Sequence, residues 1–149
     1  MSDNTFRFVI DGQSIETSGE ETILEIAKKN SIVIPHLCFK EGYKPDGNCR
    51  SCMVEIRGER VLAPACCRFP IDGMEVTTSS QRVRLNQHLV LELLEADLGG
   101  KVLEKEERPS ELKLWMKHLK ITKNRFPLRE HSADAIDTTN PAIKVDLNQ

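Results

Sequence analysis

The sequence predicts a small α+β domain followed by a helical extension. Three observations predict it. Short strand patterns mix with one helix pattern before residue 78, all five cysteines lie between Cys38 and Cys67, and two longer amphipathic helix patterns follow Ser80. Strands and a helix mixed in this way are typical of α+β domains. We therefore expect an α+β domain over 1–78, a packing helix within 79–100, and a linker, amphipathic helix and polar tail over 101–149.

The first 30 residues read as a hairpin and a helix. Strands are expected at 5–10 and 13–17, joined by the turn signal Asp11-Gly12. Thr22 and Glu25 fit a capping box, in which a hydroxyl and a carboxylate three residues later satisfy free backbone N–H groups. The buried face of the helix is expected to contain Ile23, Ile26 and Ala27.

The middle of the chain reads as a loop and three short strands. Residues 38–51 are rich in Gly, Pro, Asp and Asn, which predicts a long irregular loop. Strand patterns follow at 52–57, 60–63 and 74–77.

Two helices are expected after Ser80. The first, at 81–97, carries two adjoining stripes, Val83/Gln87/Val90/Leu94 and Leu85/Leu89/Leu93, and should pack partly on the α+β domain. Gly99-Gly100 ends it. Two adjoining apolar stripes are more than one small contact usually requires.

The second helix is expected around Leu112, Trp115, Met116 and Leu119, after a charged linker at 101–108. Short isolated helices are marginal in water. We therefore expect its amides to exchange faster than those of 83–95, and its partner to be a downstream domain or another subunit. Six basic residues within 113–129 indicate a solvated face or an acidic partner, and the chain after Pro127 reads as a polar tail.

Composition narrows the function classes. The 149 residues are 39% hydrophobic and 30% charged, with a formal net charge of −2, so global charge favours neither nucleic acid nor an anionic membrane. No apolar run approaches the roughly 20 residues that span a bilayer. The N-terminus shows no secretory signal pattern, so we expect a cytoplasmic protein without membrane insertion.

No Gly-rich phosphate loop or nucleophile–base pair is present, so no catalytic residue and no nicotinamide or flavin site is predicted.

The cysteines indicate one metal centre. Cytosolic thiols stay reduced, so clustered cysteines there are metal ligands or catalysts more often than disulfides. Cys38, Cys49, Cys52 and Cys66 can converge on an iron–sulfur cluster, with a Cys-x-x-Cys pair supplying two thiolates from one loop. Gly42 and Gly47 allow unusual backbone conformations, Gly47, Asn48 and Ser51 are small enough for N–H groups to reach sulfur, and Arg50 adds positive charge.

Other interpretations remain open on spacing alone. Four cysteines can hold a structural zinc ion in an interaction module, and Cys49/Cys52 could act as a redox dithiol. Cys67 is expected to point away from Cys66 as a buried thiol, with an alternative ligand or reactive site as the second interpretation. His36 is expected to be structural, because a Rieske-type centre needs two histidines.

Three stretches resemble a known family: Pro35-His-Leu-Cys38, Gly47-Asn-Cys-Arg-Ser-Cys-Met-Val-Glu-Ile56 and Leu62-Ala-Pro-Ala-Cys-Cys-Arg68. They are similar to the N-terminal ferredoxin-like domain shared by formate dehydrogenase alpha subunits, the large iron–sulfur subunit of complex I, and iron–sulfur subunits of hydrogenases. The resemblance covers residues 5 to about 96. The run over 58–68 looks most like the soluble NAD-linked molybdenum- or tungsten-dependent formate dehydrogenase.

That resemblance implies a β-grasp fold and a [2Fe–2S] cluster ligated by Cys38, Cys49, Cys52 and Cys66. It also implies one-electron transfer beside partner subunits or domains that carry further Fe–S clusters, molybdopterin or flavin. Complex I relatives carry a second cysteine set after the first long helix, but residues 98–149 contain no cysteine, so that cluster cannot form here. The chain is expected to be a leading fragment or a naturally short subunit.

Overall fold

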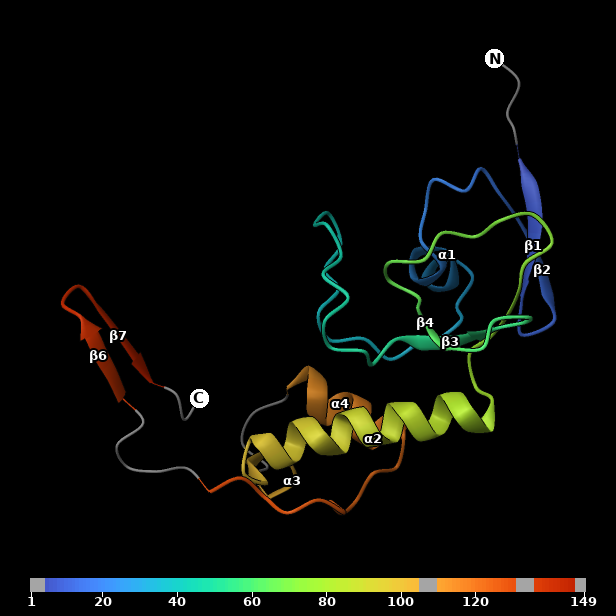
Figure 1. Ribbon diagram of the computed structural model, residues 1–149. Helices are drawn as coiled ribbons and strands as arrows, with labels where there is room; N and C mark the ends of the chain where they lie inside the picture. Colours follow the sequence, from blue (N-terminus) through green and yellow to red (C-terminus); the bar gives the residue numbers. More distant parts are fainter. Residues whose placement is uncertain (1–4, 105–109, 131–135, 147–149) are drawn as a thin grey trace. The chain divides into compact units, whose positions relative to one another are not determined.

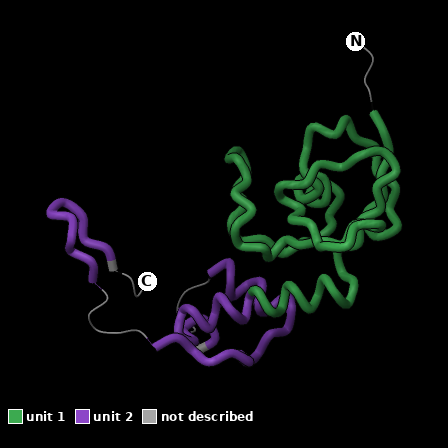
Figure 2. The backbone as a smooth tube through the Cα atoms, viewed as in Figure 1, with its two compact units in different colours: residues 1–90 green, residues 91–149 purple. Residues whose placement is uncertain are grey.

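The computed structural model describes residues 5–104, 110–130 and 136–146. The chain forms two compact units, residues 1–90 and residues 91–149 (Figure 2). Helix α2, Gln81–Asp97, continues from the first unit into the second. The predicted boundaries at 78 and 100 stay predictions.

A mixed five-stranded sheet forms the frame of the first unit, with strand order β2-β1-β5-β3-β4 (Figure 1). The strands are β1 (Phe6–Ile10), β2 (Gln13–Thr17), β3 (Met53–Ile56), β4 (Ala63–Pro64) and β5 (Glu75–Thr77). Only β1 and β5 pair in parallel, and the other neighbours are antiparallel. The predicted α+β class is confirmed as a mixed sheet with helices.

The first hairpin turns where the sequence predicts it. Asp11 and Gly12 have φ of 49° and 84°, the left-handed pair that a tight hairpin turn requires. The Asp11 carboxylate also accepts a hydrogen bond from the Thr78 backbone N–H at 2.8 Å. This turn therefore ties the end of the last sheet strand to the first hairpin.

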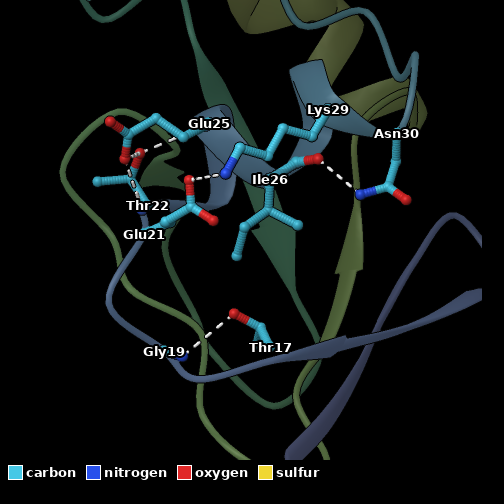
Figure 3. A network of polar contacts seen from close by, with 8 residues as sticks. All are labelled: Thr17, Gly19, Glu21, Thr22, Glu25, Ile26, Lys29 and Asn30. Carbon is cyan, nitrogen blue, oxygen red and sulfur yellow. Dashed lines mark hydrogen bonds and ion pairs between the residues drawn. The ribbon is translucent and has the colours of Figure 1, made fainter. Parts of the chain in front are cut away.

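Helix α1, Ile23–Lys29, begins at the predicted capping box (Figure 3). The Glu25 carboxylate accepts from the Thr22 N–H at 2.8 Å, and the Thr22 hydroxyl accepts from the Glu25 N–H at 3.3 Å. Lys29 pairs with Glu21 at 2.5 Å. The core that α1 shares with the sheet includes the cysteines Cys52 and Cys66 as well as Phe8, Ile10, Ile23, Leu24, Ile26, Ala27, Val54 and Val76.

Helix α2 buries part of the surface formed by its two predicted stripes. Val83, Gln87 and Leu91 are buried, whereas Leu85 and Leu93 are 54% and 50% exposed. The first half is tied to unit 1, because Arg82 lies 3.7 Å from Glu55. The helix therefore covers only part of its two apolar stripes. Residues 83, 87 and 91 follow the helical repeat of one stripe only.

The second unit contains the end of α2, a short helix α3 (Lys101–Glu104) and α4 (Glu111–His118). The expected linker is thus partly helical, because the Glu95 carboxylate accepts from the Leu103 N–H at 2.9 Å and so caps α3. The predicted helix α4 is present, and its Leu112 and Met116 are buried. We expected the partner of this helix to be a downstream domain or another subunit, whereas these two side chains are already buried within this chain. The rest of the linker, 105–109, lies outside the described residues.

The segment expected to be a polar tail contains a hairpin, β6 (Ile136–Asn140) and β7 (Ile143–Asp146), paired antiparallel with an irregularity between Asp137 and Asn140. All five residues of β6 are exposed. No helix among the described residues is long and apolar enough to span a membrane.

Candidate metal centre

The loop that carries Cys38 and Cys49 has no regular secondary structure. Its path depends on residues in the left-handed region: Gly42 at φ 82°, Gly47 at φ 69° and Arg50 at φ 56°. Glycine adopts this region without a Cβ penalty, as the sequence predicts for both glycines. Arg50 stands between Cys49 and Cys52, so its backbone conformation helps to bend the Cys-x-x-Cys segment.

The other two candidate ligands are placed by strand pairing. Cys52 directly precedes β3, and Met53 of β3 pairs with Pro64 of β4. The Ala65 N–H then donates to the Cys52 carbonyl at 3.0 Å, one step beyond the ladder. This register brings the segment that contains Cys66 beside Cys52 without any help from the loop.

Helix α1 fixes that segment from the other side. The first free N–H groups of α1, on Ile23 and Leu24, donate to the carbonyls of Arg68 and Ala65 at 2.8 and 3.0 Å. Helix N-termini leave such donors without intrahelical partners, and the carbonyls of this segment accept their hydrogen bonds. The sequence shows the capping box but not this second use of the helix start.

The four predicted ligands meet as two pairs. The side chains of Cys38 and Cys49 interact, and so do those of Cys52 and Cys66. Cys52 and Cys66 are buried, whereas Cys38 and Cys49 are half-buried, and all four thiols are free of disulfides. Among the described residues no three His, Cys, Asp or Glu side chains are placed to hold one single metal ion.

Hydrogen bonds surround the Cys49 sulfur. The Ser51 hydroxyl oxygen lies 3.0 Å from it, and Ser51 itself is fully buried. Burial of Cys49 opposes its ionisation, but donors from Ser51 and Cys38 outweigh this effect and lower the pKa of Cys49 to about 7. The expected approach of an N–H to sulfur is realised at Ser51. Its hydroxyl was not predicted as a donor, although a serine inside a Cys-x-x-Cys segment is a usable signal.

The buried pair behaves in the opposite way. Burial raises the pKa of the Cys52 thiol, despite hydrogen bonds from Cys66. Burial also raises the pKa of Cys66, and the nearness of Cys52 adds to that effect. Iron binds thiolates, so both protons must leave when a cluster binds.

Cys67 does not lie where the sequence predicts. It is exposed, and its sulfur is 3.5 Å from that of Cys66. The expectation of a buried thiol that points away was therefore wrong. Neighbouring side chains point apart on an extended segment, but the N–H groups of Cys67 and Arg68 both donate to the Pro64 carbonyl at 3.1 Å, so the chain turns here.

His36 occupies the structural position expected for it. Its Nδ1 lies 2.8 Å from the Ile34 carbonyl oxygen, and its ring meets the edge of Phe39 at 5.8 Å between centroids. The ring thus braces the chain just before Cys38.

The donor set fits a [2Fe–2S] cluster. Such a cluster takes four cysteine thiolates, two on each of its irons. Two cysteine pairs in one site, close enough for the charges of Cys38 and Cys49 to raise the pKa of Cys52, match this requirement. The backbone and hydroxyl donors at sulfur match it as well, because hydrogen bonds to sulfur tune such centres.

The curated relatives align with the first part of this chain. One NADH-quinone oxidoreductase subunit of Rhizobium meliloti (strain 1021) is 36% identical over 91 residues, which are 61% of this chain and 11% of that protein. The NADP-reducing hydrogenase subunit HndD of Solidesulfovibrio fructosivorans is 41% identical over 93 residues, covering 59% of this chain and 16% of that protein. The NADPH-Fe(3+) oxidoreductase subunit alpha of Geobacter sulfurreducens (strain DL-1 / KN400) is 39% identical over 85 residues, covering 57% and 10%. The chain thus spans only about a tenth to a sixth of the length of these relatives.

A solved structure extends the likeness beyond the first unit. A chain of an NAD+-reducing [NiFe]-hydrogenase in the H2-reduced state matches with a TM-score of 0.73 and 25% identity, over 91% of this chain and 57% of that chain. A family model described as a 2Fe-2S iron-sulfur cluster binding domain matches residues 3–81. That match covers more than half of the chain and confirms the predicted cofactor. The protein therefore belongs to the 2Fe-2S iron-sulfur cluster binding domain family.

Proposed function

We propose that this chain transfers one electron at a time through a [2Fe–2S] cluster held by Cys38, Cys49, Cys52 and Cys66. The observation that carries the proposal is the meeting of these four thiols as two interacting pairs. The cluster would supply one-electron redox chemistry, while two-electron chemistry takes place on cofactors held by other domains or subunits. The mixed sheet of unit 1 with α1 across it is, in this proposal, a β-grasp ferredoxin domain, and residues after 78 are its helical extension.

The protein groups around the thiols would set the potential. The Ser51 hydroxyl and the backbone N–H groups of Ser51 and Cys38 direct donors at the Cys49 sulfur. Donors to sulfur favour the more negative, reduced form of such a centre. Half-burial of the Cys38/Cys49 pair leaves that side of the site open to an electron donor or acceptor.

Two classes of assembly are candidates for the whole protein. The run Gly58-Glu-Arg-Val-Leu-Ala-Pro-Ala-Cys-Cys-Arg68 supports a cytoplasmic NAD-linked formate dehydrogenase. The named relatives support, as strongly, a hydrogenase or a complex I-like NADH oxidoreductase. In each case the expected partners are oxidoreductase subunits or domains that carry further clusters, molybdopterin or flavin.

The cofactor proposal is tested on the purified chain. Protein made in iron-replete medium should contain about two irons and two sulfides per chain. It should be EPR-silent as isolated and titrate as a one-electron couple with one spin per cluster on reduction. Stoichiometric zinc without iron would instead support the interaction-module alternative, and activity that needs only Cys49 and Cys52 would support the dithiol alternative.

The assembly is tested in the source cell. An affinity tag on this chain should recover its partner subunits. The recovered complex is assayed for formate-dependent and hydrogen-dependent reduction of NAD+ and for NADH-dependent reduction of quinone. Formate activity supports the first assembly, and hydrogen or quinone-linked NADH activity supports the second. Recovery of the chain without any redox partner would contradict both.

A further inference from the structure

The fifth cysteine lies on the ligand side of the site. The Cys67 sulfur is 3.5 Å from the Cys66 sulfur. A Cβ placed on Gly47 would come within 2.8 Å of the same sulfur. Cys66 belongs to the buried ligand pair, and Gly47 belongs to the loop that carries the other pair. The Cys67 thiol is therefore located between the two ligand-bearing segments rather than on a separate face.

The backbone holds this arrangement in place. The turn at 64–68 is closed by N–H groups of Cys67 and Arg68 on the Pro64 carbonyl, both at 3.1 Å. Helix α1 holds the same turn through the carbonyls of Ala65 and Arg68. Neighbours on an extended strand would direct their side chains to opposite faces. The turn instead brings both sulfurs together.

The two adjacent thiols differ in access. Cys66 is 0% exposed, whereas Cys67 is exposed, and neither forms a disulfide. A free thiol that is accessible and 3.5 Å from a ligand sulfur needs only a small side-chain movement to reach the metal bound by that ligand. No other described cysteine combines exposure with such a contact.

We infer that Cys67 is a reserve ligand that can replace Cys66 in holding the proposed cluster. This inference rests on the proposed ligand set. In the exchange, the bond between iron and the Cys66 sulfur breaks and a bond to the Cys67 sulfur forms. The Cys67 proton passes to Cys66 directly or through water. No electron is transferred, so no oxidant or reductant is required.

Three variants of the full chain test the exchange: Cys66→Ala, Cys67→Ala, and the double variant. Alanine is used because a serine oxygen could itself bind iron. Cys66→Ala should keep about two irons per chain, with altered visible and EPR spectra. Cys67→Ala should load normally with a wild-type spectrum, and the double variant should lose the cluster. Cys38→Ala is the matched control, and it should lose the cluster even though Cys67 is intact.

Alkylation with iodoacetamide gives a second measurement. In loaded wild-type protein Cys67 should be modified, while in loaded Cys66→Ala it should be protected because it binds iron. If Cys66→Ala does not fold by circular dichroism, Cys66→Ser is compared with Cys66→Ser/Cys67→Ala, and only the variant that retains Cys67 should keep a stable cluster. Loss of the cluster from Cys66→Ala or Cys66→Ser to the level of the double variants overturns the inference. A wild-type protein without iron would instead contradict the proposed function.

Discussion

The two cysteine pairs are held in opposite ways. Cys38 and Cys49 come from a loop without regular structure, and they are half-buried. Cys52 lies directly before β3 and Cys66 lies in the turn after β4. The register of these two strands joins the segments, and both cysteines belong to the hydrophobic core. The position of the Cys38/Cys49 pair, the loop pair, depends on local backbone conformation. The position of the Cys52/Cys66 pair, the buried pair, depends on the whole fold.

This difference separates two tasks. In the loop pair the pKa of the Cys49 thiol is lowered to about 7, and solvent reaches this side of the site. Burial raises the pKa of Cys52 on the other side. At neutral pH the loop thiolate is thus available first for iron, while the buried pair gives the site its fixed geometry.

Removal of one ligand from each pair should have the largest effect. Cys38→Ala and Cys52→Ala should both lose the cluster, because each removes a thiolate without a neighbouring substitute. In the cluster-free protein only Cys52→Ala should lower the free energy of unfolding, by about 1–2 kcal/mol, since it opens a gap in the core. Iron analysis and urea unfolding measure the two effects. Equal destabilisation by both variants would contradict the comparison.

Gly47→Ala tests the loop side. It adds a Cβ 2.8 Å from the Cys67 sulfur at a φ of 69°. Strain in this region costs of order 1–3 kcal/mol, so we expect destabilisation in that range and faster cluster loss.

Gly42→Ala is the matched control for Gly47→Ala, because its φ is 82° but its added Cβ meets nothing within 4 Å. It should show the backbone cost alone and a smaller effect on cluster lifetime. Gly47→Ala/Cys67→Ala should recover part of the difference. If the two single glycine variants behave alike, contact with Cys67 is unimportant.

Thr22→Ala tests the support that α1 gives to the turn at 64–68. Loss of an N-cap hydroxyl costs about 1 kcal/mol. Because Ile23 and Leu24 hold that turn, the variant should also shorten cluster lifetime at elevated temperature. Ser110→Ala removes the equivalent cap of α4 in the second unit, and it should leave cluster lifetime unchanged. The measurement is cluster absorbance over time during a thermal hold.

Local signals in the sequence were enough to predict most of the first unit. The Asp11-Gly12 turn, the capping box and the start of α2 all depend on residues close in the chain, and the structure has them as expected. The cysteine spacing likewise predicts the gathering of the four thiols. That these four are the ligands stays a proposal for the variants above to test.

The features that the sequence did not predict correctly or in full share a physical cause, because each depends on tertiary contacts. Periodicity does not tell which part of two neighbouring stripes on α2 is covered, and in the structure Leu85 and Leu93 are the exposed part. The β6–β7 hairpin has exposed side chains along β6, so it lacks the buried alternation by which strands are recognised. The prediction for the Cys67 side chain was wrong because a turn, rather than a strand, follows Pro64.

Ser51→Ala should have the smallest effect and isolates one hydrogen bond of the loop pair. The Ser51 hydroxyl is buried and lies 3.0 Å from the Cys49 sulfur. Its loss removes a donor that favours the reduced cluster, so the reduction potential should fall. The fall should be no more than roughly 60 mV, the one-electron equivalent of a tenfold change. The cluster content should stay at the wild-type level, and EPR-monitored redox titration measures the shift.

The cluster-free protein gives the same hydrogen bond a second test. The Ser51 hydroxyl lowers the pKa of Cys49, so alkylation of Cys49 in wild-type protein should accelerate as pH rises through about 7. In Ser51→Ala the pKa of Cys49 should be higher, and the acceleration should move to higher pH. Ser14→Ala on the exposed side of β2 is the control and should change neither profile. A lower potential with an unchanged alkylation profile would mean that the hydroxyl acts on the cluster by another route than its bond to Cys49.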